Sequence, residues 1–218
     1  MAEWTQEDSP RWPIVNRSSK KFVFNPTGFS CDLKREKCTA MTQKGKQCRR
    51  FTVIGLGYCW SHMRTVKNLK VQKSQIPNAG NGLFAHSPGS IKEKRNPIFK
   101  RGKKITDYNG EKITIESLNR RYDIGSKTYT APYGMSTKTG HAEDGACQRG
   151  IGTLPNTNRG KTNATLKYAR NTDQSYIEAT KGIYHNDEIF LSYGRAYRFE
   201  TVRGKSPHKT SRSYKKRG

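Results

Sequence analysis

Four residues suited to binding one metal ion lie within 25 positions of each other, and they constrain the fold more than any other feature. Cys38, Cys48, Cys59 and His62 follow the spacing C-x9-C-x10-C-x2-H. Three thiolates and one imidazole form a standard closed ligand set for structural zinc, and the C-x2-H spacing lets two ligands of one turn reach the same ion. The alternative is a set of unrelated thiols. A closed site leaves no coordination position for substrate, so we expect a structural role.

The residues around these ligands supply little else that would stabilise a fold. Residues 31–66 are rich in Gly, Lys and Arg and poor in apolar side chains. We therefore predict a zinc-binding module over residues 31–66 whose folding free energy comes from the metal. Cys31 lies seven residues before Cys38 and offers a substitute ligand, but we leave it out of the predicted set.

Positive charge is concentrated outside the centre of the chain. The formal net charge is +25; residues 17–73 carry 14 basic and two acidic side chains, and residues 201–218 carry seven basic and none acidic. Such flanks attract polyanions, chiefly nucleic acid, through counterion release and long-range steering. The alternative is that the charge only keeps these segments solvated. We predict contact with nucleic acid or chromatin.

Membrane insertion and secretion do not fit this composition. No apolar stretch approaches the roughly 20 residues of a membrane span, and the polar, acidic N-terminus is unlike a secretory signal peptide. Five cysteines is an odd number, so complete disulfide pairing within the chain is impossible. We expect a reducing intracellular compartment.

The texture of the chain changes several times along its length. Residues 1–30 show no periodicity and predict an extended arm, and residues 67–75 predict a Lys- and Gln-rich linker. From residue 76 to residue 199 short strands alternate with turns, which is typical of a mainly β domain. Residues 200–218 predict a basic disordered tail.

Individual elements of the β domain can be assigned from local patterns. Expected strands cover residues 82–85, 104–108, 111–115, 129–133, 164–170, 176–180 and 188–193. Asn109-Gly110 separates two of them and is the strongest short signal for a β-hairpin. Residues 115–122 predict a short helix with Leu118 and Tyr122 on one face.

The stretch LPNTNRGKTNATL, residues 154–166, is unusually rich in asparagine. Taken alone it is typical of a solvated turn, because Asn and Gly favour left-handed backbone and Asx-turns. Its setting favours a functional loop. It follows AGNGLFA at residues 79–85 and precedes DEIFLSYG at residues 187–194.

These motifs, with KITDYNGEKI at residues 104–113, occur in the order found in the SET domain of protein lysine methyltransferases. The chain resembles that family over residues 74–198. The resemblance implies a mainly β, SET-type fold of several small sheets with few short helices and a pseudoknot-like C-terminal segment, here preceded by a small zinc-stabilised module. The segment CTAMTQKGKQCRRFTVIGLGYCWSH also resembles small Cys/His modules of phage and large DNA virus proteins.

The resemblance also implies a cofactor and site residues. S-adenosylmethionine would be bound by Ala79, Gly80, Asn81, Gly82, Leu83, Asn156 and Thr157. Tyr193 would orient the substrate amine, and Tyr108 would line the same channel; the alternative for each is a half-buried strand tyrosine bonded to backbone. Tyr129 and Tyr133 are weaker candidates for the channel.

A channel with aromatic walls suits the chemistry. A lysine side chain has a pKa near 10.4 and must be neutral to attack, which costs roughly 4–5 kcal/mol at pH 7. A dry channel disfavours the charged amine and lowers that cost, while aromatic faces hold the cation beforehand.

The sequence departs from the family in three places. The family's Asn-His-Ser-Cys is Asn156-Thr157-Asn158-Arg159 here. No cysteine cluster flanks the domain, so we expect the channel to be closed by residues 197–199 or by a second subunit in a homodimer. Cys147 stands alone and is predicted to be a small buried hydrophobe. Leu191 replaces an aromatic residue, which favours di- or trimethylation.

The predicted function is S-adenosylmethionine-dependent N-methylation of a lysine in a histone or other basic protein tail, with the basic flanks docked to chromatin. The expected location is the nucleus, or a host nucleus or virion if the protein is viral. One alternative is a catalytically inactive SET fold that binds or packages nucleic acid. Another is a methyltransferase for a non-histone basic protein.

Overall fold

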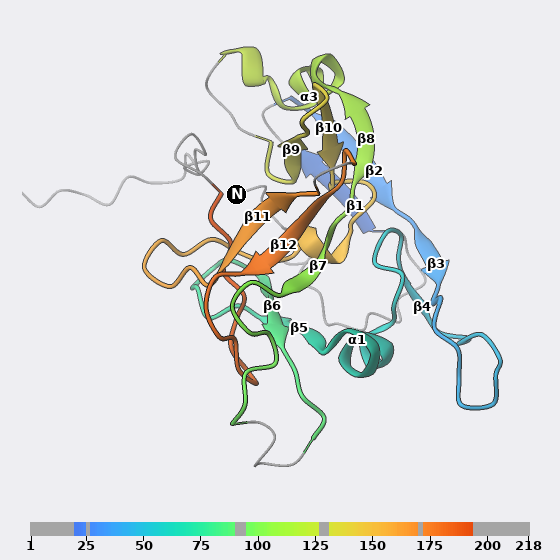
Figure 1. Cartoon of the computed structure of the whole chain (residues 1–218). Coiled ribbons are helices and arrows are strands. Elements are labelled where there is room, and N and C mark those ends of the chain that lie inside the picture. Colours follow the sequence, from blue (N-terminus) through green and yellow to red (C-terminus); the bar gives the residue numbers. More distant parts are fainter. Residues whose placement is uncertain (1–19, 25–26, 90–94, 127–130, 170–171, 194–218) are drawn as a thin grey trace, which may run out of the picture.

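The computed structural model describes residues 20–24, 27–89, 95–126, 131–169 and 172–193 (Figure 1). This part of the chain is built mainly of short strands with two α-helices, as predicted. The strands are β1 (Lys20–Phe24), β2 (Phe29–Leu33), β3 (Arg35–Lys37), β4 (Phe51–Val53), β5 (Leu69–Lys73), β6 (Asn81–Ala85), β7 (Lys104–Tyr108), β8 (Glu111–Thr114), β9 (Gly134–Ser136), β10 (His141–Asp144), β11 (Ala164–Tyr168) and β12 (Ser175–Ala179). The helices are α1 (Trp60–Lys67) and α3 (Ile115–Tyr122), with 3-10 turns η2 (Ile124–Ser126) and η3 (Ile151–Thr153).

The strands form five small antiparallel sheets. Their orders are β1-β2, β8-β10-β9, β11-β12-β7, β3-β4 and β5-β6. Figure 1 shows β11, β12 and β7 at the centre of the molecule, and β11 and β12 form an antiparallel pair. In the part of the chain that is described, no helix is both long and apolar enough to cross a membrane.

The hairpin predicted at Asn109-Gly110 is wrong. Strand β7 pairs with β12, and β8 pairs with β10, so the turn is a corner between two sheets. The corner is crowded, because a Cβ atom on Gly110 would lie 2.6 Å from the carbonyl carbon of Asp144. The Gly150 amide also donates to the Asn109 carbonyl at 3.0 Å. Gly110 is therefore explained by close approach of other backbone rather than by hairpin geometry.

The last predicted strand, residues 188–193, is not a continuous strand. Its residues make isolated bridges: Glu188 with Phe84, Phe190 with Asn156, and Leu191 with Ala164. The segment therefore joins three parts of the chain that lie far apart in sequence, as expected of a pseudoknot-like C-terminal segment.

The predicted helix over residues 115–122 is confirmed. Thr114 caps it by accepting a hydrogen bond from the Ser117 amide at 3.1 Å, and Leu118 and Tyr122 are buried together. The predicted strand at 129–133 is not observed in its described residues. Residues 131–133 are not in a strand, and the next strand, β9, begins at Gly134. Residues 129–130 lie outside the described ranges.

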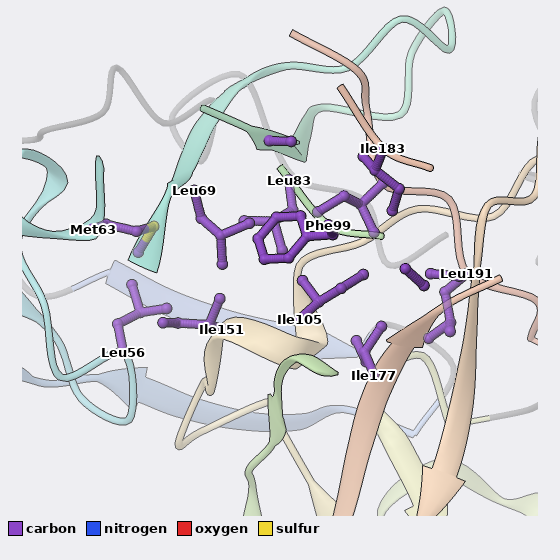
Figure 2. Packing of buried hydrophobic residues seen from close by; sticks show 14 residues of the cluster. Leu56, Met63, Leu69, Leu83, Phe99, Ile105, Ile151, Ile177, Ile183 and Leu191 are labelled. Atoms are coloured by element: carbon purple, nitrogen blue, oxygen red, sulfur yellow. The ribbon is translucent and has the colours of Figure 1, made fainter. Parts of the chain in front are cut away.

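The main hydrophobic core extends across the predicted domain boundaries. Figure 2 shows it running from Leu56 and Met63, near α1, to Ile177 and Leu191, with Phe99 between them. Leu56 and Met63 belong to the predicted zinc module, yet both are buried in the core of the β domain. The two regions therefore share one core.

Two predicted irregular segments form strands instead. Residues 20–33 of the predicted arm and module form the β1-β2 hairpin, and the boundary expected between residues 30 and 31 falls inside β2. Most of the predicted linker, residues 67–75, forms β5, which pairs with β6 and buries Leu69. Strands this short, with polar side chains on one face, resemble linkers in sequence. The predicted tail at 200–218 lies outside the described residues.

Cys147 does not stand alone, contrary to the prediction. It forms a disulfide with Cys31 on β2, with the two Cα atoms 5.8 Å apart. The odd number of cysteines excluded complete pairing, but it did not exclude this one pair. The three remaining cysteines are free thiols at 38, 48 and 59.

Candidate active site and candidate metal centre

The four predicted zinc ligands are gathered at one point. The ligand atoms of Cys38, Cys48, Cys59 and His62 all lie within 4.8 Å of one another. The Nδ1 atom of His62 is 3.4 Å from the Sγ atoms of Cys38 and Cys59. Ligands at normal zinc distances in a tetrahedron lie roughly 3.5–3.8 Å apart, so the set fits a structural zinc ion. Cys31 is bonded elsewhere and is not a ligand.

The backbone around this cluster is arranged to hold thiolates. Cys59 caps the start of α1, which places His62 in the first helical turn. The Cys59 amide donates to Cys38 Sγ at 3.2 Å, and the Arg50 amide donates to Cys48 Sγ at 3.5 Å. Such N–H donors orient the ligands and stabilise their charge.

Glu36 has a structural role that the sequence did not reveal. Its Oε1 atom accepts hydrogen bonds from the amides of Gly55 and Gly57, each at 3.1 Å. Both glycines have left-handed φ values, 92° and 71°. The carboxylate therefore fixes the loop that leads from β4 to Cys59.

Tyr108 and Tyr193, the predicted channel residues, line one narrow cavity of about 110 Å³. Apolar side chains, including Met135, Leu166 and Leu191, form much of its remaining wall. A narrow, largely apolar cavity with two phenol groups has the character expected of a channel for a lysine side chain.

Each tyrosine hydroxyl also bonds to backbone, as the alternative interpretation expected. The Tyr193 hydroxyl donates to the Pro155 carbonyl at 2.7 Å, and the Tyr108 hydroxyl donates to the Tyr133 carbonyl at 2.7 Å. The pKa of Tyr108 is raised well above its ordinary value of 10.0, mainly because the hydroxyl is buried and secondly because Tyr193 is near. A phenol oxygen that donates its hydrogen also carries lone pairs, and lone pairs are the acceptors that an amine N–H requires.

Asn156 connects the asparagine-rich stretch to the glycine loop. Its Nδ2 atom donates to the Asn81 carbonyl at 3.0 Å and to Glu188 Oε1 at 3.2 Å. Because Pro155 accepts the Tyr193 bond, Asn156 is adjacent in sequence to a contact of the channel. The residues predicted to bind the cofactor and those predicted to line the channel are therefore neighbours.

Glu188 is a buried carboxylate at this junction that sequence reasoning missed. It accepts hydrogen bonds from the Ser74 hydroxyl and the Gln75 amide, both at 2.7 Å. A Cβ atom on Gly82 would lie 2.1 Å from Glu188 Oε1. Gly82 is thus explained by the approach of Glu188, rather than by the approach of a cofactor. The acidic residue inside the apolar segment DEIFLSYG was the available signal.

The other predicted cofactor residues lie in different environments. Gly80 is exposed with φ of 70°, and nothing lies within 4 Å of where its Cβ would be. Ala79 and Thr157 are half-buried, and Leu83 is fully buried in the main core. Gly80 directly precedes Asn81, whose carbonyl accepts the hydrogen bond from Asn156. The Leu83 side chain packs in the core, so only its backbone in β6 would face a bound cofactor.

Asn163 locks the C-terminal segment beside the site. Its side chain accepts from the Phe190 amide at 2.8 Å and donates to the Glu188 carbonyl at 2.8 Å. It is 6% exposed, so these bonds are shielded from water. Although it belongs to the asparagine-rich stretch, its side chain supports the fold rather than a ligand.

Tyr133 does not belong to the cavity lining. Its ring lies between Phe22, at 5.7 Å between ring centroids, and the Arg149 guanidinium, at 4.3 Å. Its carbonyl accepts the hydrogen bond from the Tyr108 hydroxyl. Tyr129 and the segment 197–199 lie outside the described residues.

No family model and no curated protein matches this chain. Among solved structures, it is similar to CpSET8 from Cryptosporidium, with 19% identity and a TM-score of 0.42 over 58% of this chain and 57% of that one. It is also similar to a humanized mutant of the Chaetomium thermophilum Polycomb Repressive Complex 2, with 23% identity and a TM-score of 0.46 over 60% of this chain and 15% of that one. A polycomb repressive complex 2 in the basal state gives 24% identity and a TM-score of 0.45, over 59% and 15%.

The chain therefore spans just over half the length of the first structure and a small part of the other two. SET-domain proteins are thus among the structures it is similar to.

Proposed function

We propose that this chain is a SET-type, S-adenosylmethionine-dependent protein-lysine N-methyltransferase. The observation that carries the proposal is the shared cavity of Tyr108 and Tyr193, next to the contact between Asn156 and Asn81. Four motifs that are separate in sequence support the same function, because their residues are neighbours in the fold.

The residues of the cavity suit a lysine amine. The amine must lose a proton before it attacks, and the apolar walls at Leu166 and Leu191 favour the neutral form. The hydroxyl oxygens of Tyr108 and Tyr193 would accept its N–H groups and orient the nitrogen lone pair. Bound S-adenosylmethionine would supply the methyl group as a sulfonium electrophile, held by residues 79–81 and Asn156.

The substrate and location follow from the resemblance and the charge. We propose a lysine in a histone or other basic protein tail, reached in the nucleus by an enzyme whose basic flanks dock to nucleic acid. Leu191 lines the cavity and is smaller than an aromatic residue, which favours di- or trimethylation.

The first test is Tyr193→Phe, assayed with radiolabelled S-adenosylmethionine on core histones. Loss of the hydroxyl misorients the amine, so we expect kcat to fall about 10²-fold while cofactor affinity, measured by calorimetry, is unchanged. Tyr184→Phe is the matched control, because Tyr184 is exposed and lies outside the cavity lining. Its activity should equal that of the wild type.

The inactive alternative makes the opposite prediction. A catalytically inert SET fold would give no label above Tyr193→Phe and no cofactor binding, while still binding nucleic acid. That result would refute the enzyme proposal. If label is transferred, a peptide array distinguishes a histone substrate from a non-histone basic protein.

A further inference from the structure

One wall of the candidate channel is backed by the N-terminal hairpin. Residues 131–135 line the cavity except for Tyr133, whose ring packs against Phe22 of β1. The Tyr133 carbonyl accepts two hydrogen bonds, from the Tyr108 hydroxyl at 2.7 Å and from the Gly145 amide at 3.0 Å. Tyr133 is therefore the point at which the channel meets the structure behind it.

The hairpin supplies much of that structure. Phe22 and Phe24 of β1 are buried in a second hydrophobic cluster together with Tyr122 and Ala131. Ala131 also lines the cavity, so one residue belongs to both the cluster and the channel. In Figure 1, β1 and β2 lie beside the sheet of β8, β10 and β9.

The disulfide joins two segments whose side chains contact the Tyr133 ring. Cys31 is the direct partner of Phe22 across the β1-β2 pair, and the rings of Phe22 and Tyr133 pack in a T-shaped arrangement. Cys147 lies two residues before Arg149, whose guanidinium lies over the ring at 4.3 Å. The bond between Cys31 and Cys147 thus links two segments, 116 residues apart, that both contact the Tyr133 ring.

We propose that the Cys31–Cys147 disulfide is a redox latch that holds the substrate channel in shape through Tyr133. When the bond is closed, Phe22 and Arg149 hold the ring, and the Tyr133 carbonyl holds Tyr108. When it is open, only non-covalent packing holds the hairpin against residues 131–147, and residues 131–135 become more mobile. Tyr133 is then a positioning residue for the channel.

The chemistry of the latch is thiol–disulfide exchange. A thiolate of a reduced dithiol attacks one sulfur of the bond and forms a mixed disulfide, which the second donor thiol then resolves. Two electrons and two protons pass to Cys31 and Cys147, which become thiols, and the donor becomes a disulfide. Oxidised glutathione or another disulfide closes the latch by the reverse exchange.

The test compares zinc-loaded wild type in oxidised and phosphine-reduced states with Cys31→Ser/Cys147→Ser. Peptide mapping without reduction should find Cys31 linked to Cys147 in the oxidised protein. On reduction we expect amides of residues 131–136 to exchange hydrogen about tenfold faster, while amides of β11 and β12 are unchanged. The double variant should behave like reduced wild type in both buffers.

The kinetic prediction rests on the methyltransferase proposed above. Reduction should raise KM for the peptide several-fold, with the affinity for S-adenosylmethionine unchanged, and the double variant should not respond to reductant. Equal exchange of residues 131–136 in both redox states, or no Cys31–Cys147 link, would overturn the latch. If no state transfers methyl groups, the proposed function fails, and the exchange measurement still decides the latch.

Discussion

Residues 38–62 and the strands that follow them bury different kinds of side chain. The buried residues of the metal cluster are Cys38, Ala40, Cys48 and Cys59, with Tyr58 packed against them. The body of the domain instead buries fourteen residues, nearly all aliphatic, in one continuous core. The first region gathers candidate metal ligands, whereas the second is held together by apolar burial.

The two regions are nevertheless not independent. Leu56 lies between two zinc ligands in sequence, and Met63 directly follows His62, yet both side chains pack in the core of the body. The metal cluster therefore fixes the loop and helix that deliver these two side chains. A module that looks separable in sequence is a part of the domain that is organised around a candidate metal site.

The largest expected effect comes from removing a ligand. Cys59→Ser should abolish zinc binding and lower the free energy of unfolding by more than about 5 kcal/mol, because structural zinc contributes roughly 10–16 kcal/mol in small modules. Metal analysis and thermal unfolding measure both. Ser61→Ala, in the same turn, is the control. Finding less than about one zinc per chain in wild type would contradict the metal assignment.

A smaller effect tests whether the regions share one core. Met63 is fully buried, so Met63→Ala should cost about 2–5 kcal/mol in urea unfolding. Met41 is 60% exposed, and Met41→Ala should change stability by less than about 0.5 kcal/mol. We also expect Met63→Ala to weaken zinc affinity, because it loosens α1. Unchanged affinity would show that the metal site folds on its own.

The smallest expected effect is the pH dependence of stability that comes from one buried carboxyl group in the body of the domain. Glu143 is 2% exposed, its Oε2 atom has no hydrogen-bond partner among the described residues, and burial raises its pKa to about 7. The folded state thus binds this proton more tightly than the unfolded chain. The stability that the protonated Glu143 carboxyl gives to the folded state is fully present below pH 4.5 and is lost as pH rises through 7.

Glu143→Gln should therefore stabilise the protein by about 2–3 kcal/mol at pH 8 and have little effect at pH 5. Zinc ligands respond in the opposite direction, because acid protonates them. Urea unfolding of zinc-loaded protein at both pH values measures the difference, with exposed Glu116→Gln as control. An equal effect of Glu143→Gln at the two pH values would show that this carboxyl does not titrate differently on folding.

Local patterns predicted the features whose geometry is itself local. The spacing of Cys38, Cys48, Cys59 and His62 sufficed for the metal cluster, because a tetrahedral ion accepts few arrangements of ligands. The helix at 115–122 followed from the period of its apolar residues. The order of motifs correctly brought Tyr108 and Tyr193 to one cavity.

Long-range contacts were predicted poorly. The Asn109-Gly110 signal for a hairpin was strong, yet β7 and β8 do not pair with each other. Strand β7 pairs with β12, and β8 pairs with β10. Strand β5 looked like a linker and β1 like an arm, because each is short and gains stability only from its partner. Glu188 gave no local sign of the three donors that surround it.

The sequence by itself therefore determined the mainly β class and the Cys/His cluster, and it predicted that Tyr108 and Tyr193 would line one cavity. Tertiary structure alone decided that the metal cluster and the body share a core, that Cys31 meets Cys147, and that the hairpin backs the channel wall. The physical reason is that ligand spacing and periodicity act over a few residues. Pairing between distant segments depends instead on which buried donors and apolar faces are left to satisfy once the chain has collapsed.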